Sequence, residues 1–224
     1  MYTKHKWIHN TFYNFQYVQY LPQNYNPKEK YPLVFFLHGA GERGNDLDIA
    51  SRHGFMKHVR ESGAEYPFIF IAPQCPFDKY WGCYTESLLA FLDYICEELP
   101  IDKGRIYLTG LSMGGTGTFM LAMAAPERFA AIAPICGTGI YWNAAILKNI
   151  PVYMYHGDCD DTVPIQESIS MLTRLHQCGG NAQLKICYGV AHNAWDVAYE
   201  GDELVKWLLA QNINEDSSKK LKTR

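Results

Sequence analysis

Apolar runs alternate with more polar segments along most of this chain, and the alternation sets the first expectation for the fold. Apolar or β-favouring runs stand at 33–37, 68–72, 106–109, 130–135, 152–155 and 184–188. Runs that are apolar throughout are typical of parallel strands buried on both faces. Helical patterns lie between them, at about 85–99, 113–125, 165–178 and 196–211. This order predicts a doubly wound α/β fold, with a mostly parallel sheet and helices on both faces.

The start of the chain has a different pattern. In 11–20, aromatic side chains at positions 13, 15 and 17 alternate with polar ones at 14 and 16. Such alternation predicts an edge strand that belongs to a hairpin and ends near Pro22. Further along, only Cys136 to Ile150 connects the strands predicted at 130–135 and 152–155. We therefore expect no large lid domain at that point, and an open site.

Length and composition agree with a single enzyme domain. The chain has 224 residues, of which 48% are hydrophobic and 19% charged, values that are ordinary for a globular protein. We expect one domain over 1–212 and a flexible C-terminal tail over 213–224, where a polar segment precedes a basic run. The formal net charge of −3 gives no basic surface that would indicate nucleic acid or a membrane as a partner. The oligomeric state does not follow from the sequence.

Targeting signals and cysteine usage favour the cytoplasm. No apolar run is long enough to span a bilayer, and Met1–Trp7 lacks the apolar core of a signal peptide. A leader removed before residue 1 would, however, leave this same sequence. The seven cysteines are odd in number and scattered, which favours free thiols in a reducing compartment. No two of them have the spacing of a zinc site, so we expect no metal.

The candidate chemistry starts at Ser112. A β-type run at 106–108 enters the turn Gly110-Leu111-Ser112-Met113-Gly114, and a helix-favouring run at 119–125 leaves it. Strand, turn and helix in this order are the context of a Gly-x-Ser-x-Gly nucleophile elbow. The turn is so sharp that a Cβ at either flanking glycine would collide with the neighbouring backbone. Ser112 is therefore the candidate nucleophile, at a helix N-terminus where the dipole favours negative charge.

A second motif offers the groups that would stabilise an oxyanion. The apolar run 33–37 ends in His38-Gly39, and a glycine-rich loop continues to Gly44. Acyl transfer at such a serine uses two backbone N–H groups, one from the residue after the nucleophile and one from the loop after an earlier strand. Here these are Met113 and Ala40. The glycines alone would equally fit a flexible loop, and we expect His38 to be a hydrogen-bonded structural residue.

Two segments after predicted strands supply an acid and a base. One carries Asp158, Asp160 and Asp161, and the other carries His192. A serine hydroxyl is a poor nucleophile until an imidazole removes its proton, and the imidazole needs a carboxylate to orient it. The chain order Ser, Asp, His is that of the α/β-hydrolases. Charge alone does not rank the three aspartates.

Taken together, these segments resemble the α/β-hydrolase superfamily. The likeness is to small bacterial serine esterases of the dienelactone hydrolase, feruloyl/acetylxylan esterase and phospholipase/carboxylesterase group, from about Leu33 to Leu209. The residues that carry it are His38–Gly44, Ala72–Pro76, Gly110–Gly115, His156–Pro164 and Ala191–Trp195. In the family pattern the acid stands three residues before the Val of Val-Pro, which is Asp160; Asp161 is the alternative. Dienelactone hydrolases proper use cysteine as nucleophile, which makes their reaction less expected here.

The resemblance implies a serine carboxylic-ester hydrolase that works through an acyl-enzyme, without a cofactor. It implies a triad of Ser112, Asp160 and His192, and favours short-chain acyl or hydroxycinnamoyl (feruloyl-type) esters of small molecules or oligosaccharides. Two other activities stay open. Serine peptidases of the prolyl oligopeptidase type share this catalytic domain. Acyl thioesterases and lysophospholipases share a His-Gly-Asp-Cys-Asp segment, which stands here at 156–160.

Three tryptophans are candidates for the substrate pocket. Trp81, Trp142 and Trp195 fall in predicted loops beside these motifs. Their rings could receive an acyl or phenolic group, because aromatic side chains supply a large apolar area. Each ring could instead close the core at a loop end. A non-catalytic binding module on the same scaffold is the remaining alternative, and the presence of all three triad residue types disfavours it.

Overall fold

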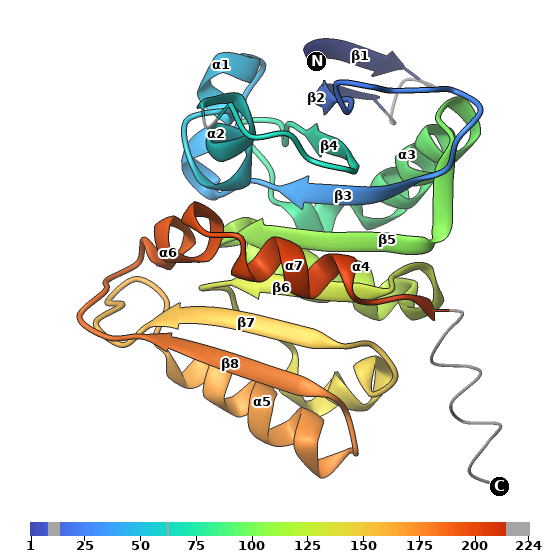
Figure 1. Cartoon of the computed structure of the whole chain (residues 1–224). Helices are drawn as coiled ribbons and strands as arrows, with labels where there is room; N and C mark the ends of the chain where they lie inside the picture. The colour runs from blue at the N-terminus through green and yellow to red at the C-terminus, as the bar shows by residue number, and fades with distance from the viewer. Residues whose placement is uncertain (9–13, 62, 214–224) are drawn as a thin grey trace, which may run out of the picture.

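A computed structural model of the chain describes residues 1–8, 14–61 and 63–213, which build one eight-stranded sheet flanked by helices (Figure 1). The strands are β1 (Tyr2–Ile8), β2 (Asn14–Tyr20), β3 (Tyr31–Leu37), β4 (Ile69–Pro73), β5 (Ile101–Leu111), β6 (Ala131–Ile135), β7 (Val152–Gly157) and β8 (Ala182–Cys187). Their order in the sheet is β1-β2-β4-β3-β5-β6-β7-β8. From β4 to β8 all neighbours are parallel, whereas β2 pairs antiparallel with both β1 and β4. The predicted doubly wound, mostly parallel sheet is confirmed.

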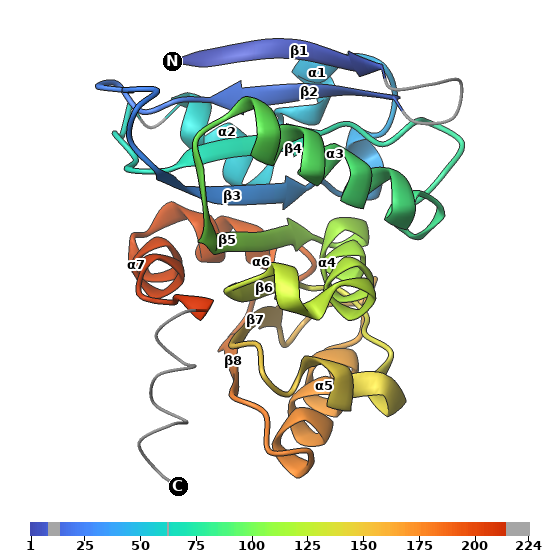
Figure 2. The same ribbon diagram turned by 90° about the vertical axis from the view of Figure 1, so that its right-hand side faces the viewer.

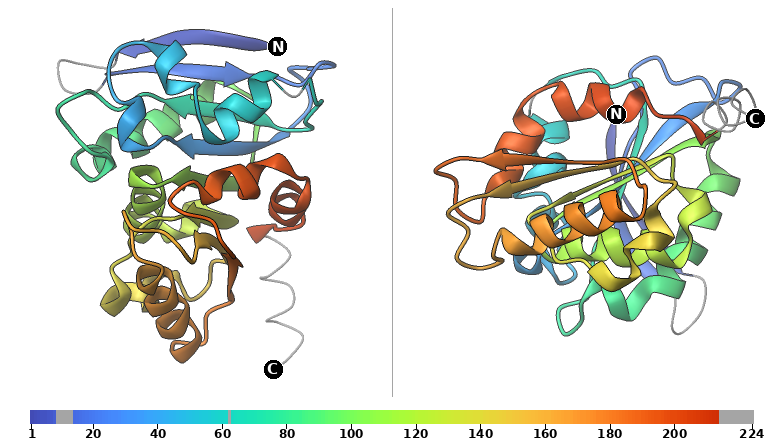
Figure 3. Two further views of the ribbon diagram at one scale, coloured as in Figure 1. Left: turned by 90° about the vertical axis from the view of Figure 1, so that its left-hand side faces the viewer. Right: turned by 90° about the horizontal axis from the view of Figure 1, so that it is seen from below.

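Helices cover both faces of the sheet. The α-helices are α1 (Leu47–Ala50), α2 (Gly54–Glu61), α3 (Thr85–Glu98), α4 (Met113–Ala124), α5 (Gln166–Gln177), α6 (Ala194–Glu200) and α7 (Glu203–Leu209). Short 3-10 helices are η1 (Ala40–Glu42), η2 (Trp81–Tyr84), η3 (Pro126–Arg128) and η4 (Tyr141–Leu147). In Figure 2, α3, α4 and α5 lie on one face. The remaining helices α1, α2, α6 and α7 pack on the other face; the left view of Figure 3, taken from the opposite side, shows α1 and α2 in front and α6 and α7 at the right.

The alternation of side chains along each strand explains why the buried runs are apolar throughout. On β3, Leu33, Phe35 and Leu37 belong to the core under α3, α4 and α5. Val34 and Phe36, between them, belong to the core under α1, α2, α6 and α7. Successive side chains of a strand point to opposite faces, so a strand covered on both faces needs apolar residues at every position. No helix within the described ranges combines the length and apolar character needed to cross a bilayer.

The structure corrects three predicted elements. The strand predicted as buried at 184–188 is β8, which lies at an edge of the sheet and is only partly buried. Residues 14–20 form a strand of a hairpin, but β1 lies outside it and is the edge strand, so the predicted edge position was wrong. The alternating pattern shows only that one face is half-buried, and it cannot show which partners the strand has. Residues 11–13 of the predicted strand lie outside the described residues. The predicted helix at 196–211 is two helices, because the chain is extended at Gly201, with ψ of 170°.

The carboxyl ends of the parallel strands meet at one edge of the sheet, and the candidate residues follow them there. The connection from β6 to β7, over 136–151, contains only η4, so it holds no large lid domain. Of the predicted tail at 213–224, only residue 213 falls within the described residues.

Candidate active site

Ser112 lies in a strained turn between β5 and α4. Its φ of 53° and ψ of −116° are sparsely populated for a residue with a side chain, and such strain concentrates at functional sites. The turn brings backbone segments so close that the flanking glycines have no room for a Cβ. A Cβ on Gly114 would lie 1.9 Å from the carbonyl oxygen of Leu37, and one on Gly110 would lie 2.5 Å from the oxygen of Gly114. The predicted elbow geometry is therefore present.

The base and the acid meet Ser112 in one hydrogen-bonded chain. Nε2 of His192 lies 2.8 Å from Oγ of Ser112, and Nδ1 of His192 lies 2.7 Å from Oδ2 of Asp160. Because the ionised carboxylate accepts only, Nδ1 carries the proton and Nε2 is free to accept from the serine hydroxyl. The three residues come from the ends of β5, β7 and β8, which lie far apart in the sequence.

The three aspartates of the loop after β7 have different hydrogen-bond partners. Asp160 is the one at His192, and its Oδ1 accepts hydrogen bonds from the N–H groups of Thr162 and Val163 at 3.0 and 2.9 Å. The other two have different partners: Asp158 accepts from the N–H of Gly189, and Asp161 is exposed beside the Thr162 hydroxyl.

The electrostatics of the loop keep Asp160 ionised. Burial by itself raises the pKa of Asp160, but the hydrogen bonds from His192, Val163 and Thr162 together outweigh it and leave the pKa below its usual value. Its carboxylate is fully buried, with 0% of the side chain exposed. A buried negative charge that is hydrogen-bonded on both oxygens is a strong and rigid partner for an imidazole.

The two candidate oxyanion donors are both first residues of helices. Ala40 begins η1 and Met113 begins α4. The N–H groups of a first helical turn have no carbonyl partner inside their own helix. Both N–H groups are thus available to an anion, and the α4 dipole adds a partial positive charge beside Ser112.

His38 supports the loop that carries Ala40. Its Nε2 accepts from the N–H of Cys75 at 2.9 Å, so Nδ1 carries the ring proton and donates to the oxygen of Gly39 at 2.7 Å. Complete burial lowers the pKa of His38 to about 4, and the ring is neutral near pH 7. The expected structural role of His38 is confirmed.

Trp81 is part of this support and does not line an open pocket. It is only 1% exposed, its Nε1–H donates to the carbonyl oxygen of His38 at 2.9 Å, and its ring meets the His38 ring edge-on. The predicted pocket role of Trp81 was wrong, because a tryptophan with one internal hydrogen-bond partner can be buried completely.

The other two tryptophans lie differently. Trp195 packs against the candidate base, with its ring centroid 5.3 Å from that of His192 and the planes at 84°. It also lines a cavity of ≈ 250 Å³ between α2 and α6. Trp142 is 65% exposed in η4, where its ring meets the half-exposed ring of Tyr141 edge-on. A pocket role stays a prediction for Trp142 and Trp195.

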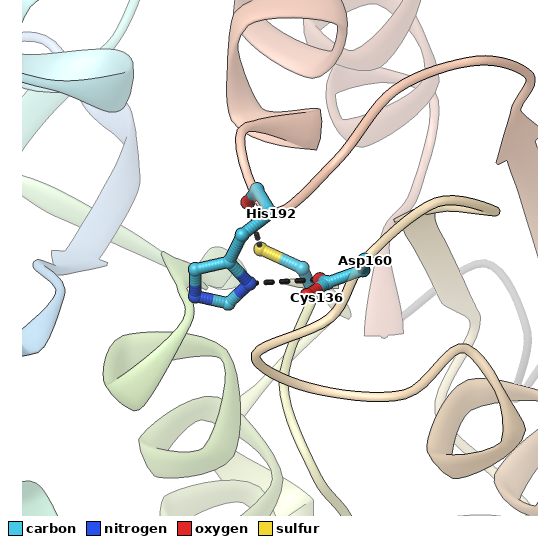
Figure 4. A group of neighbouring side chains, drawn as sticks. All are labelled: Cys136, Asp160 and His192. Carbon is cyan, nitrogen blue, oxygen red and sulfur yellow. Dashed lines mark hydrogen bonds and ion pairs between the residues drawn. The ribbon is translucent and has the colours of Figure 1, made fainter.

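Sequence reasoning missed Cys136, which lies directly beside His192 and Asp160 (Figure 4). This residue follows β6, has a φ of 39°, and its buried thiol donates to the carbonyl oxygen of His192 at 3.3 Å. Burial raises the pKa of the Cys136 thiol well above its usual value, so the thiol stays protonated. Each of the three residues has one atom that could bind a metal ion, and these atoms lie within 4.8 Å of one another, a spacing that would also suit such an ion. Here Asp160 and His192 are instead hydrogen-bonded to each other.

Comparison with known proteins places this site in context. The model of the family "Esterase: Putative esterase" matches residues 13–217. A "Probable feruloyl esterase C" of Aspergillus terreus is 30% identical over 169 residues, which cover 74% of this chain and 62% of that protein. The bifunctional acetylxylan esterase/xylanase XynS20E of Neocallimastix patriciarum is 26% identical over 177 residues, 75% of this chain and 25% of that protein. The chain thus spans about three fifths of the first protein and a quarter of the second.

Solved structures agree on the fold. The crystal structure of a thermostable esterase superposes with a TM-score of 0.84 at 34% identity, covering 94% of this chain and 63% of that one. The S954A mutant of the feruloyl esterase module from Clostridium thermocellum, complexed with sinapinate, superposes with a TM-score of 0.73 over 91% of this chain and 86% of that one. At 16% identity, the second likeness shows the fold alone.

Proposed function

Because the chain belongs to the Esterase family, we propose that it hydrolyses carboxylic esters, with Ser112 as nucleophile, His192 as general base and Asp160 as the orienting carboxylate. The hydrogen-bonded chain from Oγ of Ser112 through His192 to Oδ2 of Asp160, at 2.8 and 2.7 Å, carries the proposal. The strained backbone of Ser112 supports it, since the strain brings the hydroxyl to the start of α4.

The first half of the proposed reaction forms an acyl-enzyme. Oγ of Ser112 attacks the ester carbonyl carbon while its proton passes to Nε2 of His192. The carbonyl oxygen becomes an oxyanion that accepts hydrogen bonds from the N–H groups of Ala40 and Met113; loss of one such donor typically costs about 100- to 1,000-fold in rate. Asp160 stabilises the imidazolium. The tetrahedral intermediate then expels the alcohol, which takes the proton from His192.

The second half returns the free enzyme. Water gives a proton to Nε2 of His192 as its oxygen attacks the acyl carbon, and the oxyanion forms again at the same two N–H groups. Collapse of this intermediate breaks the bond to Oγ of Ser112 and releases the carboxylic acid, while His192 returns the proton to Oγ. Apart from the substrate and the attacking water, the groups named in the two halves are side chains and backbone N–H groups of the chain.

The proposed substrates are short-chain acyl or hydroxycinnamoyl esters, either small molecules or esters of oligosaccharides. The feruloyl and acetylxylan esterases among the relatives support this class. The short connection between β6 and β7 supports it as well, because bulky ester-bearing molecules reach a site more easily where no lid domain is inserted. The exposed rings of Tyr141 and Trp142 follow the same strand β6 and offer apolar surface on that connection.

The test is hydrolysis of p-nitrophenyl acetate and methyl ferulate, with the Ser112→Ala variant as the blank. We expect turnover of both esters by the wild type and loss of nearly all of it in the variant, with little change in melting temperature. Hydrolysis of the acetate alone would restrict the substrates to short acyl groups. Turnover within tenfold of wild type in Ser112→Ala would rule out the proposed nucleophile. A prolyl p-nitroanilide and an acyl thioester, assayed in parallel, test the peptidase and thioesterase alternatives.

A further inference from the structure

A second imidazole lies against the carboxylate of Asp160. His156 stands near the end of β7, and its side chain is completely buried. Its Nε2 lies 3.2 Å from Oδ2 of Asp160, the same oxygen that lies 2.7 Å from Nδ1 of His192. Among the residues that the structure describes, these two histidines are the only basic side chains within 4 Å of the Asp160 carboxylate.

The neighbours of His156 fix where its proton lies. Nε2 is 2.8 Å from the carbonyl oxygen of Val163, which only accepts, so Nε2 carries a hydrogen. Nδ1 is 2.7 Å from Oγ of Ser168, a buried residue of α5. In the neutral ring the Ser168 hydroxyl therefore donates to Nδ1, and the N–H at Nε2 donates to the Val163 carbonyl oxygen. Oδ2 of Asp160 lies 3.2 Å from the same nitrogen, in contact with it but not hydrogen-bonded to it.

These contacts extend the proposed triad into the protein. The polar atoms run from Oγ of Ser112 through His192 to Asp160, at 2.8 and 2.7 Å, and onward through His156 to Oγ of Ser168, at 3.2 and 2.7 Å. Asp160 is thus shared between an imidazole that reaches the serine and one that is buried behind the loop.

We infer that His156, oriented by Ser168, is a positioning residue of the proposed triad. Its N–H donates to Val163 and so holds the loop of Asp160 in place, and the positive end of that N–H beside Oδ2 draws part of the carboxylate charge away from His192. The inference rests on the proposed function, because it concerns the same site. A donor N–H close to a carboxylate, even without a hydrogen bond to it, reduces the negative potential that the carboxylate exerts on its other partner. Without that donor, Asp160 holds the imidazolium form of His192 more strongly. The base then stays protonated to a higher pH, and activity on the acid side falls earlier.

The other titratable groups around the site have little effect on how the Asp160 carboxylate is shared between His156 and His192. Cys136 after β6 and Cys187 on β8 both stay neutral, since burial raises the pKa of each thiol. In the loop itself, Asp158 is hydrogen-bonded to Gly189, and Asp161 is exposed to solvent, which screens its charge. The contact that α5 makes to this array is the neutral Ser168.

The mild test removes one hydroxyl. In Ser168→Ala, Nδ1 of His156 loses its donor and the N–H at Nε2 becomes weaker. We expect the acid limb of kcat/KM for p-nitrophenyl acetate to move up by about 0.3 pH unit, with kcat reduced about threefold and KM unchanged. Ser170→Ala is the matched control, because Ser170 stands on the same helix but is exposed. It should keep the wild-type profile.

The stronger test replaces the ring. His156→Leu removes the N–H, and we expect the acid limb to rise by about 0.5 pH unit and kcat to fall at least tenfold. His156→Gln keeps an amide N–H near the position of Nε2, so its acid limb and its kcat should both lie closer to wild type than to His156→Leu. The inference is overturned if the acid limb stays within 0.1 pH unit of wild type in Ser168→Ala and in every His156 variant that folds. A lower melting temperature without such a shift would then indicate that His156 has only a packing role. Retained activity in Ser112→Ala would instead reject the proposed function.

Discussion

The strain at Ser112 can be measured as stability. Its φ of 53° and ψ of −116° suit glycine far better than any residue with a Cβ. We compare Ser112→Gly with Ser112→Ala, because both lose the hydroxyl and its hydrogen bond to His192. The two variants then differ only in a Cβ and in backbone freedom, and Ser112→Gly should be the more stable.

The magnitude follows from two opposing terms. A non-glycine residue in such a region costs about 1–3 kcal/mol, which the glycine variant recovers. Glycine also gains freedom in the unfolded chain, which takes back about 0.5–1 kcal/mol. The net difference is about 1 kcal/mol in the free energy of unfolding. For a domain of this size that corresponds to about 2–4 °C in melting temperature.

Differential scanning calorimetry on the two variants measures this difference, and Ser170 supplies the matched pair. In α5 the backbone is helical, so Ser170→Gly should melt below Ser170→Ala, since glycine costs about 1 kcal/mol against alanine in a helix. The sign of the glycine effect should thus reverse between the two sites. Ser112→Gly melting at or below Ser112→Ala would refute the argument that strain is stored at the elbow.

Two further predictions concern buried groups near the site. Trp81→Phe removes the N–H that donates to the His38 carbonyl oxygen, so we expect the free energy of unfolding in urea to fall by about 2 kcal/mol. We also expect a lower kcat, because His38 supports the loop of Ala40. An unchanged urea midpoint would contradict this. Burial raises the pKa of Glu42, and its Oε2 has no hydrogen-bond partner in the described part of the chain. A raised carboxyl pKa favours folding at low pH and costs stability as pH rises through it. Glu42→Gln should therefore raise the urea midpoint at pH 7 and lose this advantage below about pH 4, and an equal gain at both pH values would exclude charge burial as the cause.

Features that depend on neighbouring residues were predictable from the sequence. The six predicted parallel strands are present, with ends within two residues except that β5 begins at Ile101 rather than 106. Five of them are largely buried, because a strand covered on both faces must be apolar throughout. The predicted burial of the sixth, β8, was wrong, since it lies at an edge of the sheet. The elbow at Ser112 was found because its turn excludes side chains at Gly110 and Gly114 whatever the rest of the chain does. The oxyanion roles of Ala40 and Met113 stay predictions; the structure shows that Ala40 begins a helix after β3 and Met113 begins one after β5.

Features that depend on distant partners were not predictable. The pattern of β2 could not show that β1 lies outside it, because either position leaves one face half-buried. An aromatic side chain such as Trp81 suits a pocket and a core equally. Trp81 is in the core because its Nε1–H finds a buried hydrogen-bond partner in the His38 carbonyl oxygen, which the sequence does not show. Cys136 carried no motif at all, and its contact with His192 joins residues that are 56 positions apart.

The sequence by itself determined which chemistry-bearing residue types are present, which strands carry them and how sharply the chain turns at Ser112. The resemblance to the α/β-hydrolases already favoured Asp160 as the acid, and the tertiary structure places its carboxylate at His192. The tertiary structure alone shows that His156 lies against the same carboxylate. The physical reason is that a hydrogen bond forms only where the donor–acceptor distance is correct to within a few tenths of an ångström. The ends of β5, β7 and β8 reach that precision only when the whole sheet has assembled.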